Sequence, residues 1–312
     1  MDINYELYKV FYKVAKTLSF SEASKELFIS QSAVSQSIKV LEKNLSQTLF
    51  IRSTKKVRLT KEGEMLFKHI EPAINLIMLG ENQIFEANEL GGGQLRIGAS
   101  DTICRYFLVP YLNEFHKKYP KVHIKVTNGT SLQCVELLES NQVDIIVINT
   151  PNSRLNNITS TRTIKEFHDV FIVNNEAFQI EDTTLSLEDL LDYPILMLEK
   201  NSTTSEYLHN LFLKHSLDLV PAIELSSNDL LIDLAKIGLG IAFIPDFCLK
   251  EDTKELITLK TFEELPARTL VAAYTDQIPL SDAASYFLES LSNVTIHSHE
   301  EIDESSKKQR DA

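Results

Sequence analysis

Apolar side chains recur at helical spacing near the start of the chain. One stripe falls at i, i+3, i+4, i+7, i+8 and i+11 and comprises Leu7, Val10, Phe11, Val14, Ala15 and Leu18. This spacing predicts an amphipathic helix. The segment Ser19–Glu22 has the pattern of a capping box and predicts a second helix, which buries Ala23 and Leu27.

The next helix carries two stripes of opposite character. Its apolar stripe is Val34, Ile38, Leu41 and Leu45, and its polar stripe is Ser32, Gln36, Lys39 and Lys43. The stripes are displaced by two residues, which is about 200° around a helix, so the polar stripe faces away from the core. Ser30 stands in the N-cap position and predicts that this helix begins at Gln31.

A turn of about three residues, Phe28–Ser30, separates these last two helices. Two helices joined by a short turn, the second with a polar outer face, are typical of a helix-turn-helix. Two runs that favour β-structure follow at 49–52 and 57–60, joined by a basic tip at 53–56. They predict a hairpin wing able to lie along a phosphate backbone.

Thr60 then caps a long predicted helix with one apolar edge, which consists of Leu66, Ile70, Ile74, Ile77 and Ile84. A lone helix with so long an exposed apolar edge would be prone to aggregate, so the pattern favours a partner for it. Pro72 inside this helix costs about 3 kcal/mol unless the helix kinks, and it predicts a bend. The three glycines at 91–93 end the helix and provide a flexible joint.

Beyond the glycines, short apolar strands alternate with helices. The first unit has strands at 95–98, 122–127 and 143–148 and helices at 103–119 and 132–140. A second unit, from about 160 to 265, has strands at 170–173, 195–198 and 240–245 and helices at 204–214 and 229–237. This alternation predicts mostly parallel sheets covered on both faces.

A strand at 270–274 and a helix at 283–291 are expected to return to the first unit. The chain would then pass between the units twice, near 161–165 and 266–269. Two α/β lobes joined in this way form a hinged clamp around a ligand.

Charge divides the chain where the pattern does. The first sixty residues hold ten Lys and Arg against five carboxylates, a charge of +5, which leaves −18 for the rest of a chain whose net charge is −13. A basic module on an acidic body suits a protein whose two parts meet different partners. Its 312 residues are enough for two or three domains.

Several function classes find no support in the sequence. It has no glycine-rich phosphate loop, nucleophile elbow, zinc-protease motif or paired-cysteine spacing, so we expect no metal, cofactor or catalysis. The three cysteines are scattered and are expected to be reduced and buried. No apolar run reaches the ~18 residues of a membrane span, and charges interrupt residues 1–20, so we expect a cytoplasmic protein.

The first 65 residues resemble the signature of LysR-type transcriptional regulators. The matching residues are Ser19–Ala23, Leu27, Ser30–Ile38, Leu41, Glu42, Leu49, Phe50, Arg52, Leu59, Thr60 and Gly63. One departure is Ser24, where the family usually has alanine. The two-lobed body and the run Gly238–Pro245 resemble the family's effector-binding region, which is akin to periplasmic solute-binding folds.

The resemblance implies a DNA-reading surface on the third helix and the wing. Base edges in the major groove would be met by Gln31, Ser32, Ser35 and Gln36, and a phosphate by Lys39. Arg52, Lys55 and Lys56 in the wing would hold the register. The alternative is that the serines cap or are solvated and that Arg52 braces the wing through an ion pair.

The resemblance also implies an effector site where helix N-termini follow strands at one rim of each sheet. Its candidate residues are Ser100, Thr102, Thr130, Ser131, Asn149, Ser202 and Thr203. Ordinary helix capping is the alternative for each residue taken singly. A small carboxylate or similar anion is the natural ligand, although Asp101 at the same rim would require a compensating cation such as Lys200.

We therefore expect an α/β protein with an all-α, winged helix-turn-helix N-terminal domain. The expected parts are a DNA-binding domain at 1–60, a linker and dimerisation helix at 61–90, an effector domain at 91–296 and a charged flexible tail at 297–312. Within the effector domain, lobe I would comprise 91–160 and 269–296, and lobe II 161–268.

The expected function is sequence-specific transcriptional regulation modulated by a small effector. A dimer or tetramer would place two recognition helices about 34 Å apart on an inverted-repeat operator in double-stranded DNA, and RNA polymerase would be a further partner. Two alternatives remain. The body alone would suit a solute-binding module without a role on DNA, and its cleft could serve an enzyme.

Overall fold

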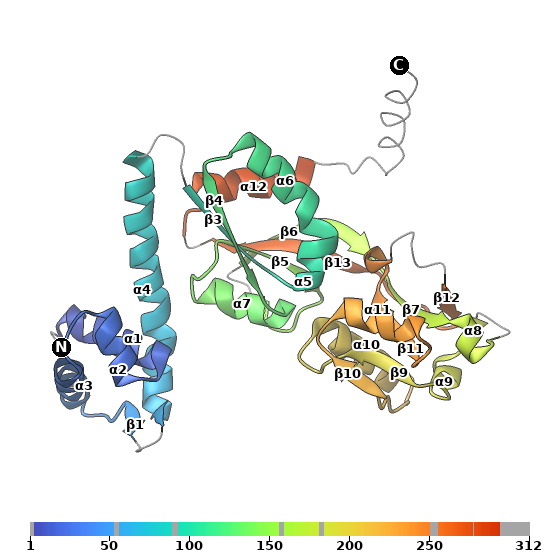
Figure 1. Ribbon diagram of the computed structural model, residues 1–312, viewed down its shortest axis with the longest axis horizontal. Helices are drawn as coiled ribbons and strands as arrows, with labels where there is room; N and C mark the ends of the chain where they lie inside the picture. Colours follow the sequence, from blue (N-terminus) through green and yellow to red (C-terminus); the bar gives the residue numbers. More distant parts are fainter. Residues whose placement is uncertain are drawn as a thin grey trace. The chain divides into compact units, whose positions relative to one another are not determined.

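Figure 1 shows the computed structural model of the protein, which describes residues 3–52, 56–88, 93–155, 159–180, 184–249, 255–276 and 278–293. The chain divides into two compact units, Met1–Leu90 with Glu139–Gln142, and Gly91–Leu138 with Val143–Ala312. Lys55 and the charged tail expected at 297–312 lie outside the described residues.

Three helices begin the first unit: α1 (Tyr5–Thr17), α2 (Phe20–Glu26) and α3 (Gln31–Leu45). The N-caps of α2 and α3 are those that the sequence predicts. The Ser19 hydroxyl accepts a hydrogen bond from the Glu22 amide at 3.2 Å, and the Ser30 hydroxyl accepts one from Ala33 at 3.1 Å. Each cap satisfies an amide that the helix itself leaves unbonded, which fixes where the helix begins.

The helices enclose one apolar core, in which Phe11, Val34 and Ile38 are fully buried. Strands β1 (Phe50–Arg52) and β2 (Val57–Leu59) pair antiparallel as the predicted wing. The ring of Phe50 in β1 lies 5.5 Å from that of Phe11 and 5.8 Å from that of Phe20, measured between centroids. These contacts fix the wing to the helical core.

Helix α4 (Lys61–Asn88) follows β2 and continues through Pro72. The Thr60 hydroxyl caps it by accepting from the Gly63 amide at 2.9 Å. Position 63 requires glycine, because a Cβ there would overlap the Leu49 carbonyl. Leu66 and Ile70 pack against the helical core. Farther along, α4 exposes large apolar side chains, namely Leu76, Ile77, Met78 and Ile84.

The second unit contains two sheets. The first, called lobe I with its helices, has the strand order β4-β3-β5-β13-β6. Its strands are β3 (Gly93–Ala99), β4 (Val122–Asn128), β5 (Ile145–Thr150), β6 (Thr159–Phe167) and β13 (Arg268–Thr275). Its helices are α5 (Asp101–Ile103), a π-helical turn (Cys104–Leu108), α6 (Val109–Lys118), α7 (Ser131–Glu139) and α12 (Asp282–Asn293). Apolar clusters cover both faces of the sheet.

The second sheet, called lobe II with its helices, has the order β10-β9-β11-β7-β12-β8. Its strands are β7 (Asp169–Asn174), β8 (Thr184–Leu185), β9 (Ile195–Leu198), β10 (Ile223–Leu225), β11 (Ile241–Pro245) and β12 (Leu256–Thr261). Its helices are α8 (Asn175–Phe178), α9 (Leu187–Leu190), α10 (Thr203–Lys214), α11 (Asn228–Lys236) and a 3₁₀ turn (Asp246–Cys248).

Two details differ from the sequence expectation. Each sheet combines antiparallel with parallel pairs, because strands that enter from the other lobe, β7 in lobe II and β13 in lobe I, pair antiparallel with their neighbours. In addition, β6 stays in the sheet of lobe I as far as Phe167, so the chain crosses at His168 and not near 161–165. Residues 161–167 therefore belong to lobe I. Among the described helices, none has the length and apolar character to cross a membrane.

Candidate nucleic-acid interface and ligand cleft

The outward face of α3 is polar and exposed, as its sequence stripe predicts. Gln31, Ser32, Gln36 and Lys39 are all exposed, whereas Val34 on the opposite face is fully buried. The hydroxyls of Ser30 and Ser32 lie 2.8 Å apart, so Ser32 shares the cap of the helix. The face offers amides, hydroxyls and a lysine, and no carboxylate, to a molecule that approaches it.

Arg52 in the wing is held by its neighbours. Its Nη1 donates to the half-buried Ser35 hydroxyl at 3.0 Å, and its Nη2 lies 3.7 Å from the Glu42 carboxylate. The guanidinium also lies 4.5 Å from the centroid of the Phe20 ring. Arg52 therefore braces the wing against α3, as the alternative interpretation of this residue expected. Lys56 is exposed at the end of the described part of the wing.

A cleft of about 290 Å³ lies between the two lobes. Ser100 and residues of β4, β5, α5 and α7 line it from lobe I, and residues around the N-termini of α10 and α11 line it from lobe II. It brings together all seven candidate effector residues: Ser100, Thr102, Thr130, Ser131, Asn149, Ser202 and Thr203. Thr204, Ser227 and Asn228 are among the polar residues of the wall that the sequence candidates did not include.

Hydroxyls around the cleft accept hydrogen bonds from the protein. The caps accept from amides three residues on, Ser100 from Ile103, Thr130 from Gln133, Ser202 from Ser205 and Ser227 from Leu230, at 3.0–3.4 Å. The Ser131 hydroxyl accepts from the Asn149 amide at 3.2 Å. A hydroxyl has one proton to donate beside its two acceptor positions, so each of these groups keeps that proton for a ligand.

Two asparagines add acceptors to the cleft wall. Asn149 and Asn228 are 9% and 4% exposed, and the Oδ1 atom of each has no hydrogen-bond partner among the described residues. Leaving a buried polar atom unbonded costs about 1–3 kcal/mol, so a ligand group that donates to these atoms would be favoured. The Asn228 side chain also bridges the lobes, since its Nδ2 donates to the Thr102 hydroxyl at 3.0 Å.

A second bridge between the lobes lies next to Asn228. The Tyr106 hydroxyl, in the π-helical turn of lobe I, donates to the Asp229 carboxylate at 2.6 Å, and Arg105 lies 3.2 Å from the same oxygen. Burial raises the pKa of Tyr106, and the hydrogen bond to Asp229 raises it further. The phenol is therefore neutral and donates across the gap between the lobes at physiological pH.

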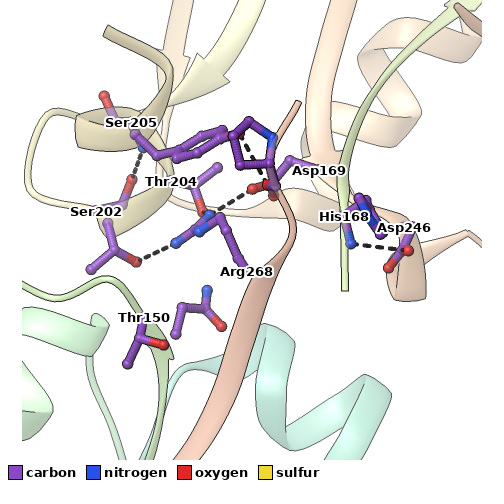
Figure 2. A network of polar contacts seen from close by, with 12 residues as sticks. Thr150, His168, Asp169, Ser202, Thr204, Ser205, Asp246 and Arg268 are labelled. Atoms are coloured by element: carbon purple, nitrogen blue, oxygen red, sulfur yellow. Dashed lines mark hydrogen bonds and ion pairs between the residues drawn. The ribbon is translucent and has the colours of Figure 1, made fainter. Parts of the chain in front are cut away.

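Two buried charged side chains, Arg268 and Asp169, meet beside the cleft residues Thr203 and Thr204 (Figure 2). Arg268 is 1% exposed, and its Nη1 donates to the Asp169 carboxylate at 2.7 Å. The same nitrogen donates to the Thr204 hydroxyl at 3.0 Å, and Nη2 donates to the Thr203 hydroxyl at 3.1 Å. Burial raises the pKa of Asp169, and the Arg268 charge opposes that rise.

Sequence reasoning did not identify Arg268 or Asp169. A weak signal was present, because each is a charged residue at the head of an apolar strand, β13 and β7 respectively. Lys200, the cation suggested from the sequence, is exposed and does not line the cleft. Asp101 and Glu199, both exposed, do line it. In the described part of the chain, no cluster of three or more His, Cys, Asp and Glu could hold a metal ion.

Comparison with known proteins assigns both parts of the chain to the same family of regulators. Residues 5–64 match the family model for bacterial regulatory helix-turn-helix proteins of the lysR family. Residues 88–295 match the model for the LysR substrate binding domain. A relative, the HTH-type transcriptional activator CmpR of Synechocystis sp., is 29% identical over 242 residues, which cover 78% of this chain and 79% of CmpR.

Solved structures share the fold. Full-length CbnR in complex with its target DNA covers 92% of this chain and 98% of its own, with a TM-score of 0.64 and 16% identity. The regulatory domain of Synechocystis CcmR, solved in complex with 2-PG, covers 66% of this chain and 99% of its own, with a TM-score of 0.60 and 24% identity. The chain therefore belongs to the LysR family and is a DNA-binding transcriptional regulator with an effector-binding domain.

Proposed function

We propose that the outward face of α3 reads base edges in the major groove of duplex DNA. Gln31, Ser32, Ser35 and Gln36 would contact bases, because amides and hydroxyls match the donors and acceptors displayed there. Lys39 would bind a phosphate, and Arg52, Lys55 and Lys56 in the wing would hold the register. The exposure of Gln31, Gln36 and Lys39 opposite a buried apolar stripe carries this proposal.

The exposed apolar side chains of α4, listed above, suit pairing with a second copy of the chain. Pairing would give a dimer or a dimer of dimers, whose two α3 helices would meet an inverted-repeat operator about one helical turn apart. We infer that this regulator works in the cytoplasm, where its DNA and RNA polymerase are found. The proposal treats 1–60, 61–90 and the two-lobed body as separate functional parts, with catalysis in none of them.

For the cleft, we propose a small carboxylate or similar oxyanion as the effector. The N-termini of α7, α10 and α11 open onto it, and their partial positive charge favours an anion. The hydroxyls of Ser100, Thr130 and Ser202, as described above, keep protons to donate. The same seven residues predicted from the sequence would hold the ligand. Since Asn149 and Asn228 offer acceptors, the effector would carry a donor such as a hydroxyl beside its anionic group.

Effector binding would then alter how the protein sits on its operator. A ligand that bonds to residues of both lobes stabilises one arrangement of the lobes over others, and this shift would be passed to the paired DNA-binding domains. A DNase footprint with and without effector tests this step. Identical footprints and identical DNA bending in both states would exclude it.

Two measurements on the full-length chain test the function as a whole. In a gel shift with operator DNA, affinity should fall steeply as salt rises, with a log–log slope near −0.9 for each phosphate neutralised. A solute-binding module without a role on DNA would show no such binding.

A thermal-shift screen of small carboxylates, phosphates and neutral sugars should then find stabilisation by anions, since a ligand that binds only the folded state raises its melting temperature. Stabilisation by neutral sugars alone would contradict the oxyanion class.

A further inference from the structure

Arg268 and Asp169 mark the two places where the chain passes between the lobes. Arg268 opens β13, which enters lobe I, and Asp169 opens β7, which enters lobe II. Their ion pair therefore joins both crossing segments at one buried point. The rings of Phe167 and Tyr207 lie 5.4 Å and 5.2 Å from the guanidinium and restrict its movement.

The guanidinium also determines whether one hydroxyl in the cleft wall donates or accepts a hydrogen bond. Arginine has only donors, so the Thr203 oxygen 3.1 Å from Nη2 must accept. Within the described residues, this hydroxyl donates to no protein group, and Thr203 lines the cleft. Its proton is therefore left for a ligand. In contrast to the cap hydroxyls, which accept from the amides of their own helices, Thr203 depends on a side chain from another element.

The three oxygen contacts of Arg268 suit arginine specifically. Two nitrogens of one planar fork reach the Asp169 carboxylate and the hydroxyls of Thr203 and Thr204 together. A lysine would bring the same charge as a single ammonium on a flexible stem and would not hold this geometry.

We propose that Arg268 is a positioning residue that determines the ligand specificity of the cleft by acting through Thr203. Its guanidinium fixes the Thr203 hydroxyl as a donor, which favours oxyanions over ligands that offer only donors. Arg268 lies in one crossing segment, bonds to Asp169 in the other, and bonds to Thr203 and Thr204 at the N-terminus of α10. A ligand bound at Thr203 is therefore coupled to the relative position of the lobes. The ligand class in this proposal rests on the proposed function, whereas the role of Arg268 toward Thr203 and α10 does not.

A double-mutant cycle tests the link to Thr203. We would measure the binding of inorganic sulfate, inorganic phosphate and glycolate to the full-length chain by calorimetry, for wild type, Arg268→Lys, Thr203→Val and the double variant. Each single substitution should weaken anion binding about tenfold, the loss expected for one hydrogen bond to a charged ligand. The double variant should be no weaker than Thr203→Val, because Arg268 acts through that hydroxyl. A loss of about a hundredfold in the double variant, or none in Arg268→Lys, would overturn the proposal.

Thr203→Ser provides the matched control, since it keeps the hydroxyl and should retain wild-type binding. If Arg268→Lys does not fold, the pair Thr203→Ser and Thr203→Val still decides whether the Thr203 hydroxyl donates to the anion. Equal binding by these two variants would contradict the donor role of Thr203.

Amide hydrogen exchange in the absence of ligand tests independently whether Arg268 holds the N-terminus of α10. Arg268→Lys should raise amide exchange both in residues 203–206 and in residues 169–171, while exchange in α3 stays unchanged. Unchanged exchange at 203–206 would overturn the tie to α10. If none of the three probe anions binds to the wild type, that result counts against the oxyanion class of the proposed function, and the exchange measurement still decides the role of Arg268.

Discussion

The outward face of α3 and the cleft between the lobes are built from the same kinds of side chain, but they hold them differently. On α3, one helix presents amides, hydroxyls and a lysine to solvent, and a separate apolar stripe carries the packing. In the cleft, hydroxyls and amides come from segments of both lobes, and most have a protein partner already.

On the outward face of α3, the residues proposed to contact DNA contribute little to the stability of the fold. In the cleft, the residues proposed to contact a ligand also help to stabilise it. Gln36 and Lys39 are exposed on α3, so nothing in the core depends on them. Thr203 and Asn228 are buried, and their bonds to Arg268 and Thr102 help to hold the lobes. Substitutions should therefore change DNA binding alone on α3, and binding together with stability in the cleft.

The largest expected effect is the loss of folding stability when the buried ion pair of Arg268 and Asp169 is broken. Asp169→Ala leaves the Arg268 charge buried without a carboxylate and should lower the free energy of unfolding by about 3–5 kcal/mol. Gln36→Ala on α3 is the control and should stay within about 0.5 kcal/mol of wild type. Urea unfolding measures both. Equal stability of the two variants would remove the contrast between the regions.

Local signals account for what the sequence predicted well. The period of Val34, Ile38 and Leu41 and the cap at Ser30 locate α3, because both act within one or two helical turns. Six of the seven predicted cleft residues could be proposed because each lies where a helix begins after a strand, and Asn149 because it lies at the end of a strand. Both patterns can be recognised in a short segment.

The contacts that the sequence did not reveal are long-range. Arg268 lies 99 positions from Asp169 and 65 from Thr203 along the chain, and no local pattern relates them. The predicted position of the first crossing, near 161–165 instead of at His168, was wrong for a similar reason. Strand β6 has few apolar residues, and its membership of lobe I depends on pairing with β13, which is distant in sequence.

On α3 itself, two variants should separate base reading from phosphate binding. Gln36→Ala should relax sequence preference, with about 1–3 kcal/mol less discrimination at the base it contacts. Lys39→Ala should weaken binding to every sequence alike and reduce the salt slope by about 0.9. Selection from a randomised DNA library gives the preference, and gel shifts across a salt series give the slope. A wild-type preference in Gln36→Ala would show that this side chain does not read bases.

Arg52 lies between the two cases, since it contacts both α3 and the wing but sits near the face that we propose reads DNA. Arg52→Ala should cost about 1 kcal/mol, because its ring contact contributes about 0.5–1 kcal/mol and its half-exposed ion pair little. Arg58→Ala, an exposed position on β2, is the matched control and should be within about 0.5 kcal/mol of wild type. If thermal unfolding finds the two variants equally stable, Arg52 does not brace the wing.

The last prediction concerns the reaction of the cysteines, which all lie in the second unit and report on it alone. Burial and the nearby Asp101 raise the pKa of Cys104 to about 11, and burial raises the pKa of Cys134 to about 12. The reactive thiolate is therefore scarce at neutral pH, about one part in a thousand at pH 8 for Cys104.

Iodoacetamide should accordingly label the native protein slowly, with a rate that rises about tenfold per pH unit from 8 to 10. In urea, where these thiols regain an ordinary pKa of about 8.5, labelling at pH 8 should be fast. Mass spectrometry of the labelled peptides follows Cys104 and Cys134 separately. Rapid labelling of native Cys104 at pH 7 would contradict its raised pKa and would indicate an activated thiol close to the cleft residue Asn128.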